Sequence, residues 1–110
     1  MKLPNYEQAI IPEAKLTEYL LSETHPEGKE KAAFFQRFGF STEEWEALAN
    51  ALRGHAIQHE VVKMVESKYG QRFVIEGELQ TPDGRNPAIR SVWFVEWDQD
   101  TPRLVTAYPL

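Results

Sequence analysis

The chain has 110 residues, of which 42% are hydrophobic and 12% aromatic, enough apolar material for one domain spanning residues 1–110. It contains no cysteine, which excludes disulfides and thiolate chemistry and fits a cytoplasmic protein. The net charge of −5 argues against a large nucleic-acid footprint but is compatible with a small, locally basic cleft. The first residues contain no apolar run long enough for a signal peptide or membrane span, so no membrane association is expected.

The first half of the chain predicts helices. Pro12 suits the first turn of a helix over residues 12–21, because its missing N–H is not needed there. A second helix is expected over residues 28–38. It should end at Gly39 in a left-handed conformation, with Phe40 folding back on the helix.

A third helix should follow the capping-box pattern in which Ser41 precedes Glu44 by three residues. Apolar residues then recur with a helical period and form one stripe. The members of this stripe are Trp45, Leu48, Ala49, Leu52 and Ala56. Because glycine weakens a helix, the end of this helix is expected between Gly54 and His59.

From residue 60 the hydrophobic period becomes alternating, which predicts strands. The expected strands are residues 61–66, 72–79, 88–97 and 103–108. The third is apolar on both faces, as is typical of a central strand, and the turn at residues 81–86 precedes it. We therefore predict an α+β fold. About three N-terminal helices (about 12–59) pack on one face of a four-stranded antiparallel meander sheet (about 60–109).

His25 is the first candidate for catalysis, since a loop histidine near cations can titrate close to neutral pH. Lys29 and Lys31 follow it, and together with the N–H groups at the start of the second helix they can hold an anion. The alternative is structural: His25 and Pro26 only shape the turn, and the lysines form a solvated face.

Arg90 is the second candidate, because an unpaired charge on a central strand is costly and needs a carboxylate or a ligand. Its candidate structural partners are Glu76, Glu78 and Glu96. Thr106 and Tyr108 can line the same face of the sheet, although both residue types are also simply favoured in strands.

His55 and His59 have the i, i+4 spacing that places two imidazoles on one side of a helix and can hold zinc. The zincin glutamate and a third ligand are missing, so we expect two solvent-facing histidines and no metal or cofactor, with an acid–base role for one of them left open. Trp97, at a strand end, is expected to be exposed and to contact a partner.

Several segments together resemble an uncharacterised bacterial family of domains of unknown function, and the resemblance covers nearly the whole chain. The main ones are LPN at 3–5, KLTEYLL at 15–21, HPEGKEKAAFFQRFGF at 25–40 and PRLVTAYP at 102–109. The ending is also similar to the last strand of small ribonuclease toxins of the barnase, colicin and RelE-like group. Only Thr106, Tyr108 and Pro109 carry that similarity.

The second resemblance implies a toxin-type ribonuclease that cleaves RNA without metal. Thr106 and Tyr108 are expected to orient the phosphate. The remaining roles are inferred from side-chain chemistry and not from the resemblance: general base and acid for His25 or His55, and stabilisation of the phosphorane charge for Lys31 and Arg90. The alternative is a non-catalytic module of the immunity or antitoxin kind that binds a cognate protein. An open sheet edge can in addition support a homodimer.

Overall fold

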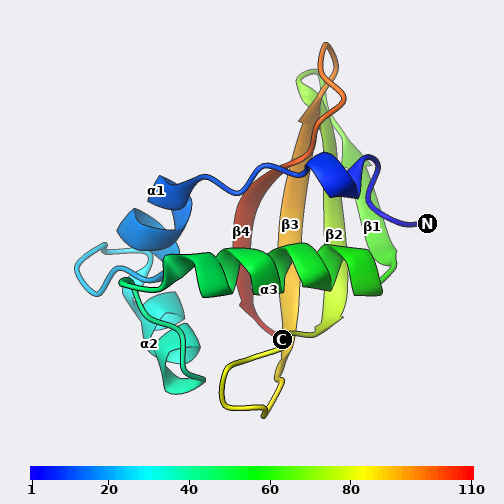
Figure 1. Cartoon of the computed structure of the whole chain (residues 1–110). Helices are drawn as coiled ribbons and strands as arrows, with labels where there is room; N and C mark the ends of the chain where they lie inside the picture. The colour runs from blue at the N-terminus through cyan, green and yellow to red at the C-terminus, as the bar shows by residue number, and fades with distance from the viewer.

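Helices precede a four-stranded antiparallel sheet with the strand order β1-β2-β3-β4 in the computed structural model, which describes residues 1–110 (Figure 1). The strands are β1 (Val61–Glu66), β2 (Gly70–Glu78), β3 (Ala88–Glu96) and β4 (Arg103–Pro109). The predicted α+β meander is confirmed, with β3 as one of its two central strands. The longest helix, α3 (Trp45–Gln58), crosses one face of this sheet and ends within the expected interval.

The first predicted helix is only partly α-helical. After the short 3-10 turn η1 (Tyr6–Gln8), helix α1 (Glu13–Lys15) passes directly into a π-helical turn, η2 (Leu16–Leu20). The N–H of Leu21 donates to the carbonyl of Leu16 at 2.7 Å, the i to i+5 bond of a π turn. This wider turn lets Leu16, Leu20 and Leu21 all reach the core while the Tyr19 side chain stays only partly buried.

Helix α2 (Lys29–Arg37) ends as its sequence predicts. Gly39 takes the left-handed conformation with φ of 105°, and the N–H of Phe40 donates to the Phe35 carbonyl at 3.2 Å. The two aromatic rings lie 6.2 Å apart, so Phe40 folds back on the helix. Helix α2 therefore ends at Arg37, and it lies beside β4 (Figure 1).

The core lies between α3 and the inner face of the sheet. Leu48, Leu52 and Ala56 of α3 are fully buried, as are Ile75 of β2 and Trp93 of β3. The alternate residues of these strands point to the opposite face, which no long helix covers. That outer face of the sheet is therefore available to build a site.

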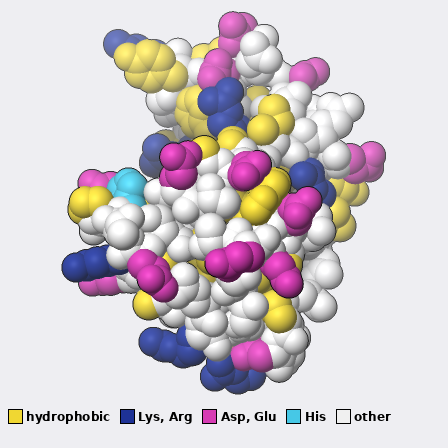
Figure 2. Space-filling view, turned by 60° about the vertical axis from the view of Figure 1, so that its left-hand side comes forward, with side chains coloured by type: hydrophobic (Ala, Val, Ile, Leu, Met, Phe, Trp, Pro, Cys, Tyr) yellow, Lys and Arg dark blue, Asp and Glu magenta, His cyan; other side chains and the backbone are white.

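The two edges of the sheet differ. Residue Ile10 pairs with β4, because its N–H donates to the Pro102 carbonyl at 2.9 Å and its carbonyl accepts from Leu104 at 3.0 Å. The outer edge of β1 has no neighbouring strand. No helix is both long and apolar enough to span a membrane. Acidic side chains, with Lys and Arg among them, are spread over the side seen in Figure 2, in keeping with the net charge of −5.

Candidate functional site

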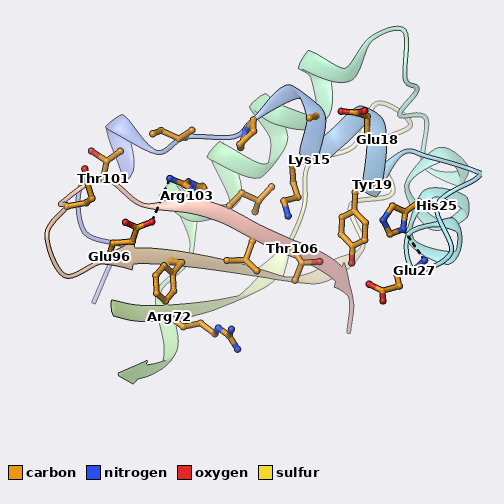
Figure 3. Close-up of a pocket in the computed structure, with 17 residues that line it drawn as sticks. Lys15, Glu18, Tyr19, His25, Glu27, Arg72, Glu96, Thr101, Arg103 and Thr106 are labelled. Atoms are coloured by element: carbon orange, nitrogen blue, oxygen red, sulfur yellow. Dashed lines mark hydrogen bonds and ion pairs between the residues drawn. The ribbon is translucent and has the colours of Figure 1, made fainter. Parts of the chain in front are cut away.

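A cavity of about 1140 Å³ lies where α1 and η2 meet the outer face of β4 (Figure 3). Its walls come from the segment that includes Tyr19, the following loop with His25, and the outer side of the sheet with Thr106 and Arg72. The helical segment supplies one wall and the sheet the other, so residues from both halves of the chain meet here.

Tyr19 is the centre of the polar contacts in this cavity. The Lys31 ammonium donates to the Tyr19 hydroxyl at 2.5 Å and lies 4.8 Å from the ring centroid. The Lys15 ammonium lies 5.4 Å from the same centroid, and the His25 ring meets Tyr19 edge-on with centroids 5.0 Å apart. The hydrogen bond from Lys31 is the main cause of a lowered phenol pKa, opposed by partial burial and assisted by the Thr106 hydroxyl.

His25 is held in one orientation by the backbone of its own loop. The N–H of Glu27 donates to His25 Nδ1 at 3.0 Å, and the N–H of His25 donates to Ser22 Oγ at 3.2 Å. Because Nδ1 accepts a hydrogen bond, the proton of the neutral imidazole lies on Nε2. In this arrangement His25 offers the cavity a hydrogen-bond donor rather than a free base.

Thr106 is the residue that joins the cavity to the rest of the sheet face. Its Oγ1 is the one buried side-chain polar atom without a hydrogen-bond partner, and it faces Tyr19 without forming a complete hydrogen bond (Figure 3). A buried hydroxyl without a partner is costly, so a hydrogen bond between Thr106 and a ligand would be favourable. Thr106 also lines an adjoining cavity of about 600 Å³ on the outer face.

Arg90 and Tyr108 belong to that second cavity. Arg90 Nε donates to Glu76 at 2.7 Å, and its Nη1 donates to the Tyr108 hydroxyl at 3.2 Å. Glu76 is thus the partner among the three candidates predicted for Arg90, and the ion pair spans β2 and β3 at paired positions. By contrast, Arg72 lines both cavities and forms no ion pair.

The charges lining the larger cavity are balanced. Its cations are Lys15, Arg72 and Arg103, and its carboxylates are Glu18, Glu27 and Glu96. Arg103 and Glu96 form a loose pair at 3.9 Å (Figure 3), and Lys31 adds a further cation behind Tyr19. The site is therefore less acidic than the chain as a whole, which carries −5.

His55 lies in the core, so the expectation that it faces solvent is wrong. It is 1% exposed, accepts a hydrogen bond from Ser91 at Nδ1 (2.9 Å) and donates from Nε2 to the Gly77 carbonyl (3.0 Å). Burial lowers its pKa to about 4. His59 Nε2 pairs with the Glu78 carbonyl at 2.8 Å. His55 thus stands apart from the cavity, and no group of three or more His, Asp or Glu side chains is arranged to hold a metal ion.

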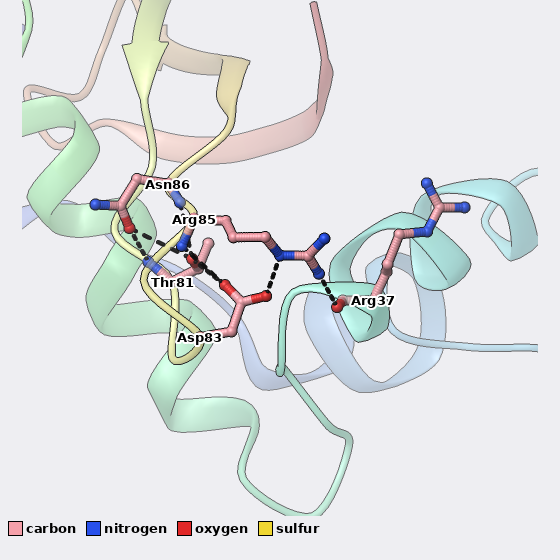
Figure 4. Close-up of polar contacts among 5 residues, drawn as sticks. All are labelled: Arg37, Thr81, Asp83, Arg85 and Asn86. Atoms are coloured by element: carbon pink, nitrogen blue, oxygen red, sulfur yellow. Dashed lines mark hydrogen bonds and ion pairs between the residues drawn. The ribbon is translucent and has the colours of Figure 1, made fainter.

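A further polar cluster, at the turn between β2 and β3, is satisfied by its own members (Figure 4). Asp83 accepts from the Arg85 Nε at 2.6 Å, and Asn86 accepts from the Thr81 N–H at 2.9 Å. Arg85 Nη2 donates to the Arg37 carbonyl at 2.7 Å, which satisfies a carbonyl at the end of α2. The residues that predict a turn in the sequence therefore stabilise the turn itself and the end of α2.

Trp97 is exposed, as predicted, with 52% of its surface accessible, and neighbouring Tyr69 is 68% accessible. The Trp97 indole donates to the Ser67 carbonyl at 2.7 Å, so its ring is held against the β1–β2 connection. This aromatic pair lies at the end of the sheet where β2 begins and β3 ends.

The predicted site residues thus divide into two groups. His25, Lys31 and Thr106 gather around Tyr19. In the adjoining cavity Arg90 pairs with Glu76 and donates a hydrogen bond to Tyr108. Sequence reasoning missed Tyr19, which lies within the first predicted helix and was not among the candidate site residues. The i, i+4 spacing from Lys15 to Tyr19 was a visible signal, but the contact with Lys31 depends on tertiary structure.

Helices followed by an antiparallel meander, with a polar cavity between the first helical segment and the outer sheet face, define a small α+β domain. Within that class the chain belongs to the family described as Domain of unknown function (DUF6883), which matches residues 2–110. The predicted resemblance to a family of this kind is confirmed. No curated protein matches the chain.

One solved structure with a similar fold comes from a contact-dependent growth inhibition toxin–immunity protein complex of Klebsiella pneumoniae 342. The TM-score is 0.73 at 20% sequence identity, over 92% of this chain and 99% of that chain. At this identity the similarity establishes a shared fold, and the two chains correspond over nearly their whole lengths.

Proposed function

We propose that this chain is a toxin-type domain that cleaves RNA without a metal ion. The observation that carries the proposal is the meeting of His25, Thr106 and Tyr19 in the large cavity. Lys31 does not line the cavity itself but donates a hydrogen bond to the Tyr19 hydroxyl. The similar fold of a chain from a toxin–immunity complex supports a role of this kind. RNA supplies its own nucleophile, the 2′-hydroxyl, so cleavage needs only acid–base groups and donors that stabilise the phosphorane.

The cavity offers these groups in suitable places. Thr106 Oγ1 has no partner in the protein and can donate to a phosphate oxygen, and Lys31 supplies positive charge beside Tyr19. Arg72 is free of ion pairs and lines both cavities, so it can contact a neighbouring phosphate of the same strand. Arg90 and Tyr108 would orient the RNA strand farther along the outer face of the sheet.

The test is cleavage of a single-stranded RNA by the purified protein in EDTA. We expect His25→Ala and Lys31→Ala to lower the rate by roughly 10²–10⁴-fold, the usual contribution of an acid–base or charge-stabilising group. Lys29→Ala is the matched control, because Lys29 is exposed on the same helical turn and, unlike Lys31, makes no hydrogen bond to Tyr19. A folded wild type that cleaves no RNA, or only after metal is added, refutes the proposal.

The second candidate is a non-catalytic protein-binding module of the immunity kind, favoured by the exposed Trp97 and Tyr69. The chain of similar fold comes from a complex that contains an immunity protein as well as a toxin. Expression in a bacterial host separates the candidates. A toxin arrests growth and the His25→Ala variant relieves the arrest, whereas an immunity-like module leaves growth unaffected.

A further inference from the structure

Within this site, and resting on the ribonuclease activity proposed above, we propose that Tyr19 is the general base that accepts the proton of the attacking 2′-hydroxyl. In the same arrangement His25 is a neutral hydrogen-bond donor to the phosphate. Tyr19 lies on the cavity wall between the unpartnered hydroxyl of Thr106 and the imidazole of His25 (Figure 3).

The surroundings of the phenol favour its ionised form. Groups from every neighbouring element face it: Lys15 from α1, Lys31 from α2, His25 and Glu27 from the loop, and Thr106 from β4. Lys31 bonds the phenol oxygen directly, and Lys15 adds a second ammonium over the ring, whereas Glu27 is the one carboxylate that opposes ionisation. The lowered pKa of Tyr19 follows chiefly from the Lys31 hydrogen bond.

The geometry of His25 excludes it from the same role unless its loop rearranges. A general base needs a free lone pair, but the Nδ1 lone pair of His25 accepts the N–H of Glu27 at 3.0 Å. The loop is fixed further, because the His25 carbonyl accepts the N–H groups of Gly28 and Lys29, both at 3.1 Å. The ring nitrogen that remains carries a proton, so it can donate to a phosphate oxygen.

The step balances without a cofactor. The Tyr19 phenolate takes the 2′-hydroxyl proton, the 2′ oxygen bonds to phosphorus, and the bond from phosphorus to the 5′ oxygen breaks. The products are a 2′,3′-cyclic phosphate and a 5′-hydroxyl, whose proton comes from water in the open cavity. Tyr19 then returns its proton to the solvent. Thr106 and His25 donate to the phosphorane oxygens while the charge develops, and the ammonium of Lys31 beside Tyr19 stabilises that charge electrostatically.

The experiment compares single-turnover cleavage of a short single-stranded RNA in EDTA by wild type and four variants. Tyr19→Phe removes the oxygen and keeps the ring, and Tyr69→Phe is its control at an exposed position. His25→Gln retains an N–H donor, and His25→Ala removes it. We expect Tyr19→Phe to lower the cleavage rate by roughly 10²–10⁴-fold and Tyr69→Phe to leave it unchanged. His25→Gln should keep far more activity than His25→Ala.

Ultraviolet titration of the phenols supplies a readout that is independent of RNA. The difference between wild type and Tyr19→Phe should show one phenol that ionises below the ordinary tyrosine range, and Lys31→Met should return it to that range. Wild-type cleavage with an unchanged rate in Tyr19→Phe overturns the base role alone, as does His25→Gln being as inactive as His25→Ala. A wild type that cleaves no RNA overturns the ribonuclease proposal itself.

Discussion

Acidification should destabilise this protein through one buried histidine, His55. Its Nε2 donates to the Gly77 carbonyl, and its Nδ1 accepts from Ser91, whose oxygen in turn accepts from the indole of Trp93 at 2.9 Å. With a neutral imidazole these partners satisfy both ring nitrogens. A second proton on His55 would require the Ser91 hydroxyl to turn its hydrogen away from Nδ1 and would place a charge in the core, where it is costly.

The size of the effect follows from the pKa of His55. Burial lowers it from 6.5 to about 4 in the folded state, whereas the unfolded chain keeps the ordinary value. The unfolded state therefore binds the proton more readily. The contribution is complete above pH 6.5 and is lost as the pH falls from 6.5 towards 4. Since one pKa unit corresponds to about 1.4 kcal/mol, the loss is about 3 kcal/mol, a large part of the stability of a small domain.

Urea unfolding at a series of pH values between neutral and about 4 measures this loss. Other groups also titrate in this range, so the comparison is with His55→Gln, which does not titrate and can still donate to Gly77. We expect His55→Gln to be less stable than wild type at neutral pH but to lose less stability on acidification. His59→Gln, at a partly exposed position one turn on, should keep the wild-type slope. Parallel curves for wild type and His55→Gln, or an NMR pKa of His55 near 6.5, would refute the reasoning.

Two glycine substitutions should act in opposite directions. At Gly54, inside α3, an added Cβ meets nothing within 4 Å, so Gly54→Ala should stabilise the protein by about 0.5–1 kcal/mol in thermal or urea unfolding. A lower midpoint would contradict this. At Gly28 the Cβ would lie 2.2 Å from the carbonyl oxygen of Tyr19. Gly28→Ala should therefore cost about 1–3 kcal/mol and displace the His25 loop, so RNA cleavage should fall with stability. Wild-type stability in Gly28→Ala would contradict this prediction, because it would show that the loop moves at little cost in free energy.

Local patterns in the sequence were sufficient for most of the fold. Alternation of apolar residues predicted β1 to the residue, and the two-sided apolar character of β3 predicted its central place. Gly39 and the turn at residues 81–86 depend on local backbone chemistry, which is readable from sequence. The first helix was predicted less well, because its π-helical turn places three leucines in the core. This arrangement is stabilised by tertiary packing and not by local sequence preferences.

For the site, residue type and local context are sufficient to nominate His25, Lys31 and Thr106 as acid–base and phosphate-binding candidates. Which of these residues meet depends on the tertiary structure. It brought Lys31 to the hydroxyl of Tyr19 and buried His55 against Ser91. Periodicity shows which face of an element a residue occupies, but not what lies opposite that face. The partners of Tyr19 come from α1, a loop, α2 and β4, so its environment exists only once the helical half packs against the sheet.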